Sequence, residues 1–351
     1  MNPTLAVAVV LISAARCGSG ARPAPREAGT DVARHDGAAG DARDGANDAR
    51  ATEKTDAGCS TAGWDAGAAV VASSDQGSLI LSQIRVDGTG PHGLTVFGLF
   101  SASFSRAGQL VTPPPLLVGG GHRAFGPGFC GLGTFGPCVV TTTACAIPTS
   151  PCPAPQAGKI AFGSPDSLDL PLSPNPDGTY PPNDLSGGLL FDSGDPQAVV
   201  AAGGDVPPFS MQVNAPGCVG LSRPAMIPLA ADAAVGSPRY LIPRGQDLAL
   251  AWTGGEAGAV VGVDLISTSP SGVVDVACSF PAGAGQGSIP QPALSWLDAG
   301  AEGYLSVYQQ TSVSTHVGTF DVQFAIRNLG DDIAAPDAGT CPVNNAYVTL
   351  Q

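Results

Sequence analysis

Residues 247–252, DLALAW, carry the pattern that decides the fold class. Leu248, Leu250 and Trp252 stand at every second position, which is the period of a β-strand with one buried face. Four later segments alternate in the same way: VVGVDLI at 260–266, VVDVACSF at 273–280, YLSVY at 304–308 and FDVQFAI at 320–326. Alternating segments this close together predict an antiparallel β-sandwich with Trp252 in its core.

An earlier segment, LTVFGLFSASF at 94–104, predicts a strand of the same kind. Its alternate positions from Leu94 to Phe104 are apolar or small, and Leu99 on the other side indicates that the second face is covered too. The chain holds 48 Gly and 33 Pro but only 13% charged residues, so turns are frequent and long helices are not expected. We therefore predict an all-β protein whose antiparallel strands form two sandwich-like modules after a disordered N-terminal tether.

The predicted organisation has five parts. They are a signal peptide at 1–17, a disordered linker at 18–57, a Cys-rich β module at 58–215, a β-sandwich module at 216–335, and a tail or extra strand at 336–351. The linker contains almost no large apolar residues, so burial cannot offset the conformational entropy that it would lose on folding. Within the second module, SIPQPALSWLDAG at 288–300 predicts one helical turn from Ala293 to Leu297.

The N-terminus resembles a bacterial lipoprotein signal. LAVAVVLISAA at 5–15 is too short to span a ~30 Å membrane core and fits the apolar region of a signal peptide. It runs into Arg16 and Cys17, and in lipoproteins the cysteine becomes the first residue and carries the lipid. The resemblance implies a membrane partner through lipid on Cys17, in the cell envelope facing the periplasm or the cell surface. Ser13-Ala14-Ala15 also fits ordinary cleavage, so the alternative is a secreted protein.

The charge balance argues against nucleic acid as a partner. The sequence holds 15 Lys plus Arg against 29 Asp plus Glu, a formal net charge of −14. Binding to a phosphate backbone is driven by clustered cations, and the chain after residue 57 contains no such cluster. We therefore expect a protein or a glycan as partner, and the sequence does not identify it.

Cysteine usage indicates export. Nine cysteines are present, and after Cys17 an even set is left that can pair completely as disulfides. These are Cys59, Cys130, Cys138, Cys145, Cys152, Cys218, Cys278 and Cys341. None has a neighbour at the spacing of two to four residues that zinc sites favour. Gly- and Pro-rich segments favour the pairs Cys130–Cys138 and Cys145–Cys152, with a crossed pairing of the same four as the alternative.

No motif with a known catalytic mechanism occurs, so we predict neither catalytic residues nor a cofactor. His92, His122 and His316 lie far apart and form no metal-binding pair. The chain also lacks the Gly-x-Ser-x-Gly turn that presents the nucleophile of α/β-hydrolases.

Two groups of residues are candidates for binding. Asp192, Asp195 and Asp205 lie in Gly-rich turns and could offer carboxylates to calcium, with solvated turn residues as the alternative. Tyr304 and Tyr308 face away from the apolar positions of their strand, where they could stack on a sugar or a partner. A covered sheet face is the alternative for both tyrosines.

A wider resemblance covers roughly residues 77 to 330. The frame GDVPPFSMQVNAPG at 204–217, PRGQDLALAWTGG at 243–255, GSIPQPAL at 287–294 and YLSVYQQ at 304–310 resembles exported lipoproteins of soil bacteria related to the myxobacteria. This resemblance implies a β-sandwich and no activity. We expect a lipid-anchored cell-envelope protein with a non-catalytic structural, adhesion or ligand-binding role. A carbohydrate-binding or hydrolytic envelope protein is the alternative.

Overall fold

The computed structural model describes the residues from 72 to 351 with gaps. The described ranges are 72, 74–86, 95–107, 109, 116–118, 122–124, 130–143, 153–186, 190–224, 239–269, 272–300, 302–332 and 343–351. The predicted signal peptide and linker lie outside them, as do Cys17, Cys59, Cys145, Cys152 and Cys341.

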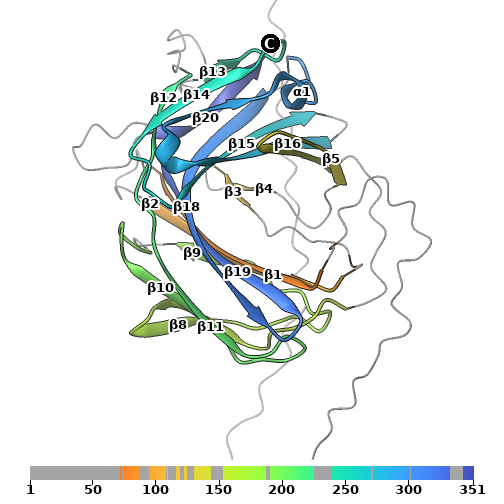
Figure 1. The fold of residues 1–351 in the computed structure, drawn as a ribbon, viewed down its shortest axis with the longest axis vertical. Helices are drawn as coiled ribbons and strands as arrows, with labels where there is room; N and C mark the ends of the chain where they lie inside the picture. The colour runs from red at the N-terminus through yellow and green to blue at the C-terminus, as the bar shows by residue number, and fades with distance from the viewer. Residues whose placement is uncertain are drawn as a thin grey trace, which may run out of the picture. The chain divides into compact units, whose positions relative to one another are not determined.

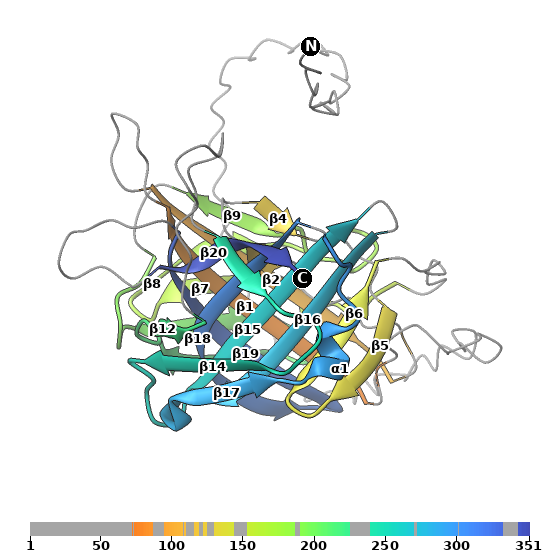
Figure 2. The same cartoon turned by 90° about the horizontal axis from the view of Figure 1, so that it is seen from above.

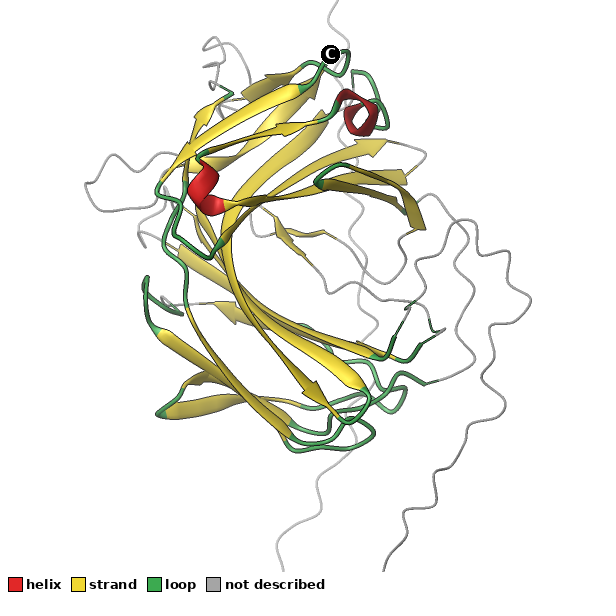
Figure 3. Cartoon of the chain, viewed as in Figure 1, coloured by secondary structure: helices red, strands yellow, loops and turns green. Residues whose placement is uncertain are grey.

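The all-β prediction is confirmed. Figure 3 shows strands joined by loops, and in the described ranges the helices are the short turns η2 (Ala282–Ala284) and α1 (Gln291–Leu294). α1 overlaps the helical turn expected from Ala293 to Leu297. Pro290 before α1 and Pro292 in its first turn suit a helix start, because proline lacks the N–H that would be unpaired there.

One sheet of 11 strands organises the molecule, and we call it the large sheet (Figure 1). Its order is β5-β6-β16-β15-β18-β20-β19-β1-β2-β9, and β13 pairs with β20 off this path. The strand bounds in that order are Cys130–Phe135, Cys138–Thr142, Gly272–Pro281, Val260–Ser269, Glu302–Val317, Val343–Leu350, Phe320–Asp332, Gln76–Val86, Thr95–Ser105 and Asn183–Ser186, with Arg239–Ile242 for β13.

β20 lies between two strands that are consecutive in the chain. The second half of β18 pairs antiparallel with β19, from Gln309↔Asn328 to Val317↔Phe320. The first half of β18 pairs instead with β20, from Glu302↔Thr349 to Leu305↔Ala346, and Asp331 of β19 pairs with Val343. The predicted tail is therefore an extra strand, and it lies within the sheet instead of at its edge.

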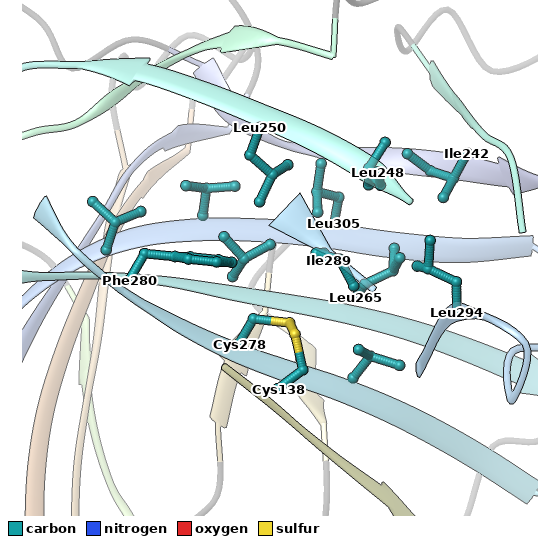
Figure 4. Packing of buried hydrophobic residues seen from close by; sticks show 14 of the residues in the cluster. Cys138, Ile242, Leu248, Leu250, Leu265, Cys278, Phe280, Ile289, Leu294 and Leu305 are labelled. Atoms are coloured by element: carbon teal, nitrogen blue, oxygen red, sulfur yellow. A yellow bond between two sulfur atoms is a disulfide. The ribbon is translucent and has the colours of Figure 1, made fainter. Parts of the chain in front are cut away.

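The first part of the large sheet packs against a small sheet of three strands. This sheet consists of β12 (Gly220–Arg223), β14 (Leu248–Thr253) and β17 (Gln286–Ile289), of which β14 and β17 cross over β15 and β16 in Figure 2. Their apolar side chains meet those of β15, β16 and β18 in a cluster that we call core one (Figure 4). Trp252 lies in core one as predicted, and its Nε1–H donates to the carbonyl of Ala282 at 2.8 Å.

The second part packs against a sheet of four strands. Its order is β11-β10-β7-β8, with bounds Phe209–Asn214, Pro196–Ala201, Ile160–Ser164 and Ser167–Leu172. The enclosed cluster, core two, is rich in aromatic residues, and the rings of Phe100 and Phe162 stack with centroids 3.8 Å apart. Leu99 on the opposite face of β2 is 1% exposed, so the second face of this strand is covered as expected. A further pair of strands, β3 (Leu116–Val118) and β4 (His122–Ala124), forms its own two-stranded sheet.

Both cores lie on the same face of the large sheet, which we call the core face. Along β18, Leu305 and Val307 belong to core one, whereas Val313 and Val317 pack against core two. These positions are an even number of residues apart, so their side chains point to one side of the strand. The opposite side, which carries Asp264 and Arg327, is the reverse face.

The two predicted modules share the large sheet, which corrects the boundary between residues 215 and 216. Core two does include Ala215, and core one does include Val219. However, core two also takes Phe324 from the second predicted module, and core one takes Val140 from the first. The reason is that the hairpin of β18 and β19 is too long for one small sheet to cover, so each end packs against a different one.

A row of buried amides separates the two cores on the core face. Gln309, Asn328 and Gln83 are directly opposite one another on β18, β19 and β1, and they are 0%, 4% and 0% exposed. Gln83 accepts from the N–H of Leu190 at 2.8 Å, and Asn328 donates to the carbonyl of Pro216 at 3.2 Å. The row therefore holds the chain segments around Leu190 and Pro216 in place against the large sheet. It also gives the N–H of Leu190 and the carbonyl of Pro216 hydrogen-bond partners that they would otherwise lack.

Candidate functional site

The structure joins Cys138 to Cys278, which shows that the predicted Cys130–Cys138 pair is wrong. Cys130 and Cys218 are disulfide-bonded as well. The segment between the two cysteines does turn back, because β5 and β6 form a hairpin, but its turn at Gly136 and Pro137 lies next to Cys138. Cys130 is thereby placed opposite Thr142 at the other end, out of reach of Cys138.

The Cys138–Cys278 disulfide lies inside core one. The two residues face each other on β6 and β16, are 0% and 3% exposed, and are separated by 140 positions in the chain (Figure 4). The bond therefore fixes an early strand to a late one, and it is shielded from reductants in solution.

The reverse face of the large sheet carries a buried charged cluster. Asp264 of β15 and Asp275 of β16 are 4% and 5% exposed. Asp275 lies opposite Ile266, two residues along from Asp264, so the carboxylates occupy diagonal positions on adjacent strands. Arg327 of β19 is the cation that interacts with both. We call Asp264, Asp275, Tyr308 and Arg327 the acidic cluster.

Tyr308 is the centre of this cluster. Its hydroxyl donates to Asp264 Oδ1 at a long 3.5 Å, and the Arg327 guanidinium lies 4.7 Å from its ring centroid. Arg327 is positioned in turn by Gln310, whose Oε1 accepts from its Nε at 2.8 Å. On the other side the ring lies against Gly262, where an added Cβ would come within 2.2 Å of ring carbons. Only glycine at this position lets the ring lie flat on β15.

The electrostatics of the cluster favour protonated carboxyls. Burial raises the pKa of Asp264 to about 6, against the opposing effect of Arg327. Burial and the charge of Asp264 raise the pKa of Asp275 well above its ordinary value. Asp275 Oδ1 has no hydrogen-bond partner, which adds to the cost of ionising it. One arginine cannot balance two buried carboxylates, so the cluster holds a proton at a pH where exposed aspartates are ionised.

This arrangement can store a proton, but it lacks the access that a hydrolytic pair needs. A glycosidase requires both carboxyls to reach the two sides of a sugar bond. Asp264 and Asp275 are buried in strand centres instead, beside a stacked tyrosine.

The predicted tyrosine pair has two different environments. Tyr308 is 7% exposed, so of the two possibilities a covered sheet face is the one that holds for it: the packing of Gly262, Arg327 and Leu329 around it covers the ring. Tyr304 lies in the same strand, four residues earlier. Its ring meets that of Tyr347 edge to face, with centroids 5.8 Å apart, and Tyr347 is 39% exposed.

The calcium candidates act as turn residues. The Asp195 carboxylate accepts from the N–H of Asp192 at 2.8 Å, within one turn. Asp205 lies elsewhere and accepts from the N–H of Gln156 at 3.0 Å. Among the residues with described side chains, no group of three His, Cys, Asp or Glu is arranged to hold a metal ion.

Of His92, His122 and His316, only His316 has a described side chain. Its Nδ1 lies 2.8 Å from Asp321 Oδ1 across the end of the hairpin, and both residues are exposed. A shallow open depression lies elsewhere, lined by Gly258, Val260, Ser279, Pro281 and Gly283 among others, and its lining contains no titratable side chain. In the described part of the chain, no helix is long and apolar enough to cross a membrane.

Sequence reasoning missed the acidic cluster. Asp264 and Asp275 occupy the positions of VVGVDLI and VVDVACSF that the alternating pattern assigns to solvent. One signal could have indicated it: each segment places a single carboxylate within an otherwise mostly apolar run. Strands with nearly continuous apolar runs are often covered on both faces, so such a carboxylate is a candidate for burial.

Comparison with known proteins gives no further assignment. No protein-family model matches the chain, and no curated protein matches it. The chemistry and placement of its own residues therefore carry the functional argument.

Proposed function

We propose that this chain is an exported β-sandwich protein of the cell envelope, held to a membrane by lipid on Cys17, with a non-catalytic ligand-binding or adhesion role. The observation that carries the proposal is the buried Cys138–Cys278 disulfide. Structural disulfides of this kind form in oxidising compartments outside the cytoplasm.

The N-terminal sequence supports the same location. The apolar segment at 5–15 and the cysteine that follows it have the order of a lipoprotein signal. The acidic sequence, with a formal net charge of −14, is repelled by anionic headgroups, so a covalent lipid is a better anchor than surface charge. A single lipid chain binds membranes only reversibly, so stable anchoring needs more than one acyl chain at this site.

The non-catalytic role is supported by where the titratable groups lie. The acidic cluster is buried, and the exposed His316–Asp321 pair stands at the tip of a hairpin. General acid–base catalysis needs paired titratable groups that a substrate can reach within a binding site, and neither the acidic cluster nor the His316–Asp321 pair provides this. A hydrolytic role is less well supported for the same reason.

The test is an intact-mass measurement on protein extracted from membranes of a bacterial expression host, with and without reduction. We expect the mass of a lipid on a chain that begins at Cys17, and a gain of two hydrogens for each disulfide on reduction. A Cys17→Ser variant should lose the lipid and leave the membrane fraction while keeping its disulfides. A wild-type chain with no lipid and with free thiols at Cys138 and Cys278 would contradict the proposal.

A further inference from the structure

An exposed aromatic surface lies on the reverse face where β20 meets β13. Tyr347 and Leu241 are 39% and 41% exposed. Strand pairing places Tyr304 opposite Tyr347, and Leu241 opposite Thr349 two residues further along β20. All four side chains therefore stand on one side of three adjacent strands. We call Tyr304, Tyr347, Leu241 and Thr349 the tyrosine patch.

From this surface we infer that the tyrosine patch binds carbohydrate, with a neutral sugar ring stacked on Tyr347. The inference rests on the proposed ligand-binding function and names its ligand class. A sugar ring presents C–H groups on one face and hydroxyls around its rim. An exposed tyrosine ring offers the complementary apolar surface.

The position of Tyr347 is held rigidly. β20 is paired on both sides, with β18 and β13 over this part of the strand. The Tyr304 ring stands at 89° to the Tyr347 ring and supports its edge. A preformed surface of this kind loses little conformational entropy when a ligand binds.

The size of the patch favours a sugar over a second copy of the chain. An aromatic side chain can bury about 150–250 Å², so the 39% exposure of Tyr347 leaves on the order of 60–100 Å² available. Leu241 adds a similar amount, which brings the exposed apolar area to roughly 120–200 Å². A stable protein interface needs about 800 Å² from each partner. The described side chains of this surface thus offer far less area than a stable dimer interface needs, and they match the face of one or two sugar rings.

Charge favours a neutral ligand. The four side chains of the tyrosine patch are uncharged, and the strand register adds one residue of each charge sign beside them, Arg239 opposite Tyr347 and Glu302 opposite Thr349. The patch and these two neighbours together carry no formal net charge, whereas the whole chain carries −14. Phosphorylated or strongly acidic polymers would be repelled by this field, whereas a neutral sugar is not affected. Half-buried Thr349 provides a hydroxyl beside the rings for the polar rim of the ligand.

The experiment is co-sedimentation of the full exported chain with three insoluble probes: purified peptidoglycan, chitin and cellulose. We compare wild type, Tyr347→Ala, Tyr347→Phe and Trp296→Ala. Trp296 is 43% exposed after α1 and serves as the matched control for loss of an exposed aromatic side chain. We expect wild type and Trp296→Ala to bind at least one probe. Tyr347→Ala should bind at least tenfold more weakly, and Tyr347→Phe should retain most of the binding because it keeps the ring.

Two results would overturn the inference: wild type that sediments with none of the probes, or Trp296→Ala that loses as much binding as Tyr347→Ala. A third contradicting result would come from analytical ultracentrifugation: if wild type is a dimer and Tyr347→Ala is a monomer, the surface is a self-association site. Urea unfolding of each variant ensures that weaker binding is compared between equally folded proteins. Release of reducing sugar from a bound probe would refute the non-catalytic function while leaving the binding site in place.

Discussion

Core one and core two lie on the same face of one sheet, yet they are stabilised differently. Core one is mainly aliphatic and contains the Cys138–Cys278 disulfide. Core two is filled by aromatic rings, among them the stacked pair Phe100 and Phe162, and Phe104 with Phe209. The difference teaches that a shared sheet does not impose a shared mode of stabilisation. Aliphatic packing is combined with a covalent tie in one core, whereas large rings fill the other.

The largest expected effect comes from removing a ring from core two. Phe162→Ala should lower the free energy of unfolding by about 3–5 kcal/mol, because it creates a cavity opposite Phe100. The comparison variant in core one, Val263→Ala, removes fewer atoms and should cost less. Urea unfolding followed by fluorescence and far-UV circular dichroism measures both. Equal losses in the two variants would show that ring packing is not what distinguishes core two.

Removing the covalent tie of core one should have the next largest effect. The double variant Cys138→Ala/Cys278→Ala should lose about 3 kcal/mol, since the bond closes a loop of 140 positions and restricts the unfolded chain. The loss should appear as a lower thermal midpoint with little change in the native circular dichroism spectrum. An unchanged midpoint would mean that aliphatic packing alone stabilises core one.

The amide row between the cores allows a test of whether they unfold together. Gln83→Leu leaves the N–H groups of Leu190 and Phe191 without their acceptor and should cost about 1–3 kcal/mol. If the row couples the cores, a single unfolding transition in the wild type should separate into two in this variant. Asn328→Leu serves as the comparison, because it breaks the contact to Pro216 instead. One sharp transition in both variants would argue against a coupling role.

The smallest effect concerns pH. The raised pKa values of Asp264 and Asp275 mean that the folded state binds protons more tightly than the unfolded state. Their stabilising contribution is present below about pH 4 and is lost as the pH rises through the raised pKa of each group, which is about 6 for Asp264. Asp275→Asn should therefore raise stability at pH 8 by about 1 kcal/mol and flatten the pH profile.

The control for this prediction is Asp195→Asn, which changes an exposed carboxylate in a turn. It should leave the slope between pH 5 and 8 unchanged. Thermal midpoints measured across this range compare the two variants with wild type. A wild-type midpoint that rises with pH through this range would contradict the assignment.

Local sequence pattern was sufficient to predict the strands but not their partners. Leu248, Val263 and Phe324 alternate as predicted and are 4%, 0% and 0% exposed. The position of β20 between β18 and β19 could not be predicted, because alternation says which side chains point inward and nothing about which strand lies alongside. The Cys138–Cys278 pair depends on the same long-range pairing of β6 with β16.

The candidate site was harder to predict than the fold. Tyr304 was identified from its alternation, but its partner Tyr347 lies 43 positions later on a segment predicted only as a tail or extra strand. Asp264 and Asp275 have the spacing of solvent-facing residues, and only the covering of the reverse face makes them buried. Sequence alternation reports one buried face reliably, whereas the burial of the second face depends on the rest of the chain.

The place of β20 also sets the order in which the protein can assemble. β1 pairs with β19, about 245 positions later, and the gap beside β19 is filled only by residues 343–350. Without residues 343–350 the first half of β18 and the strand β13 would each have an open edge, although the second half of β18 would still pair with β19. Strand pairings between segments this far apart in the chain form slowly, and open strand edges favour aggregation until the pairings are made.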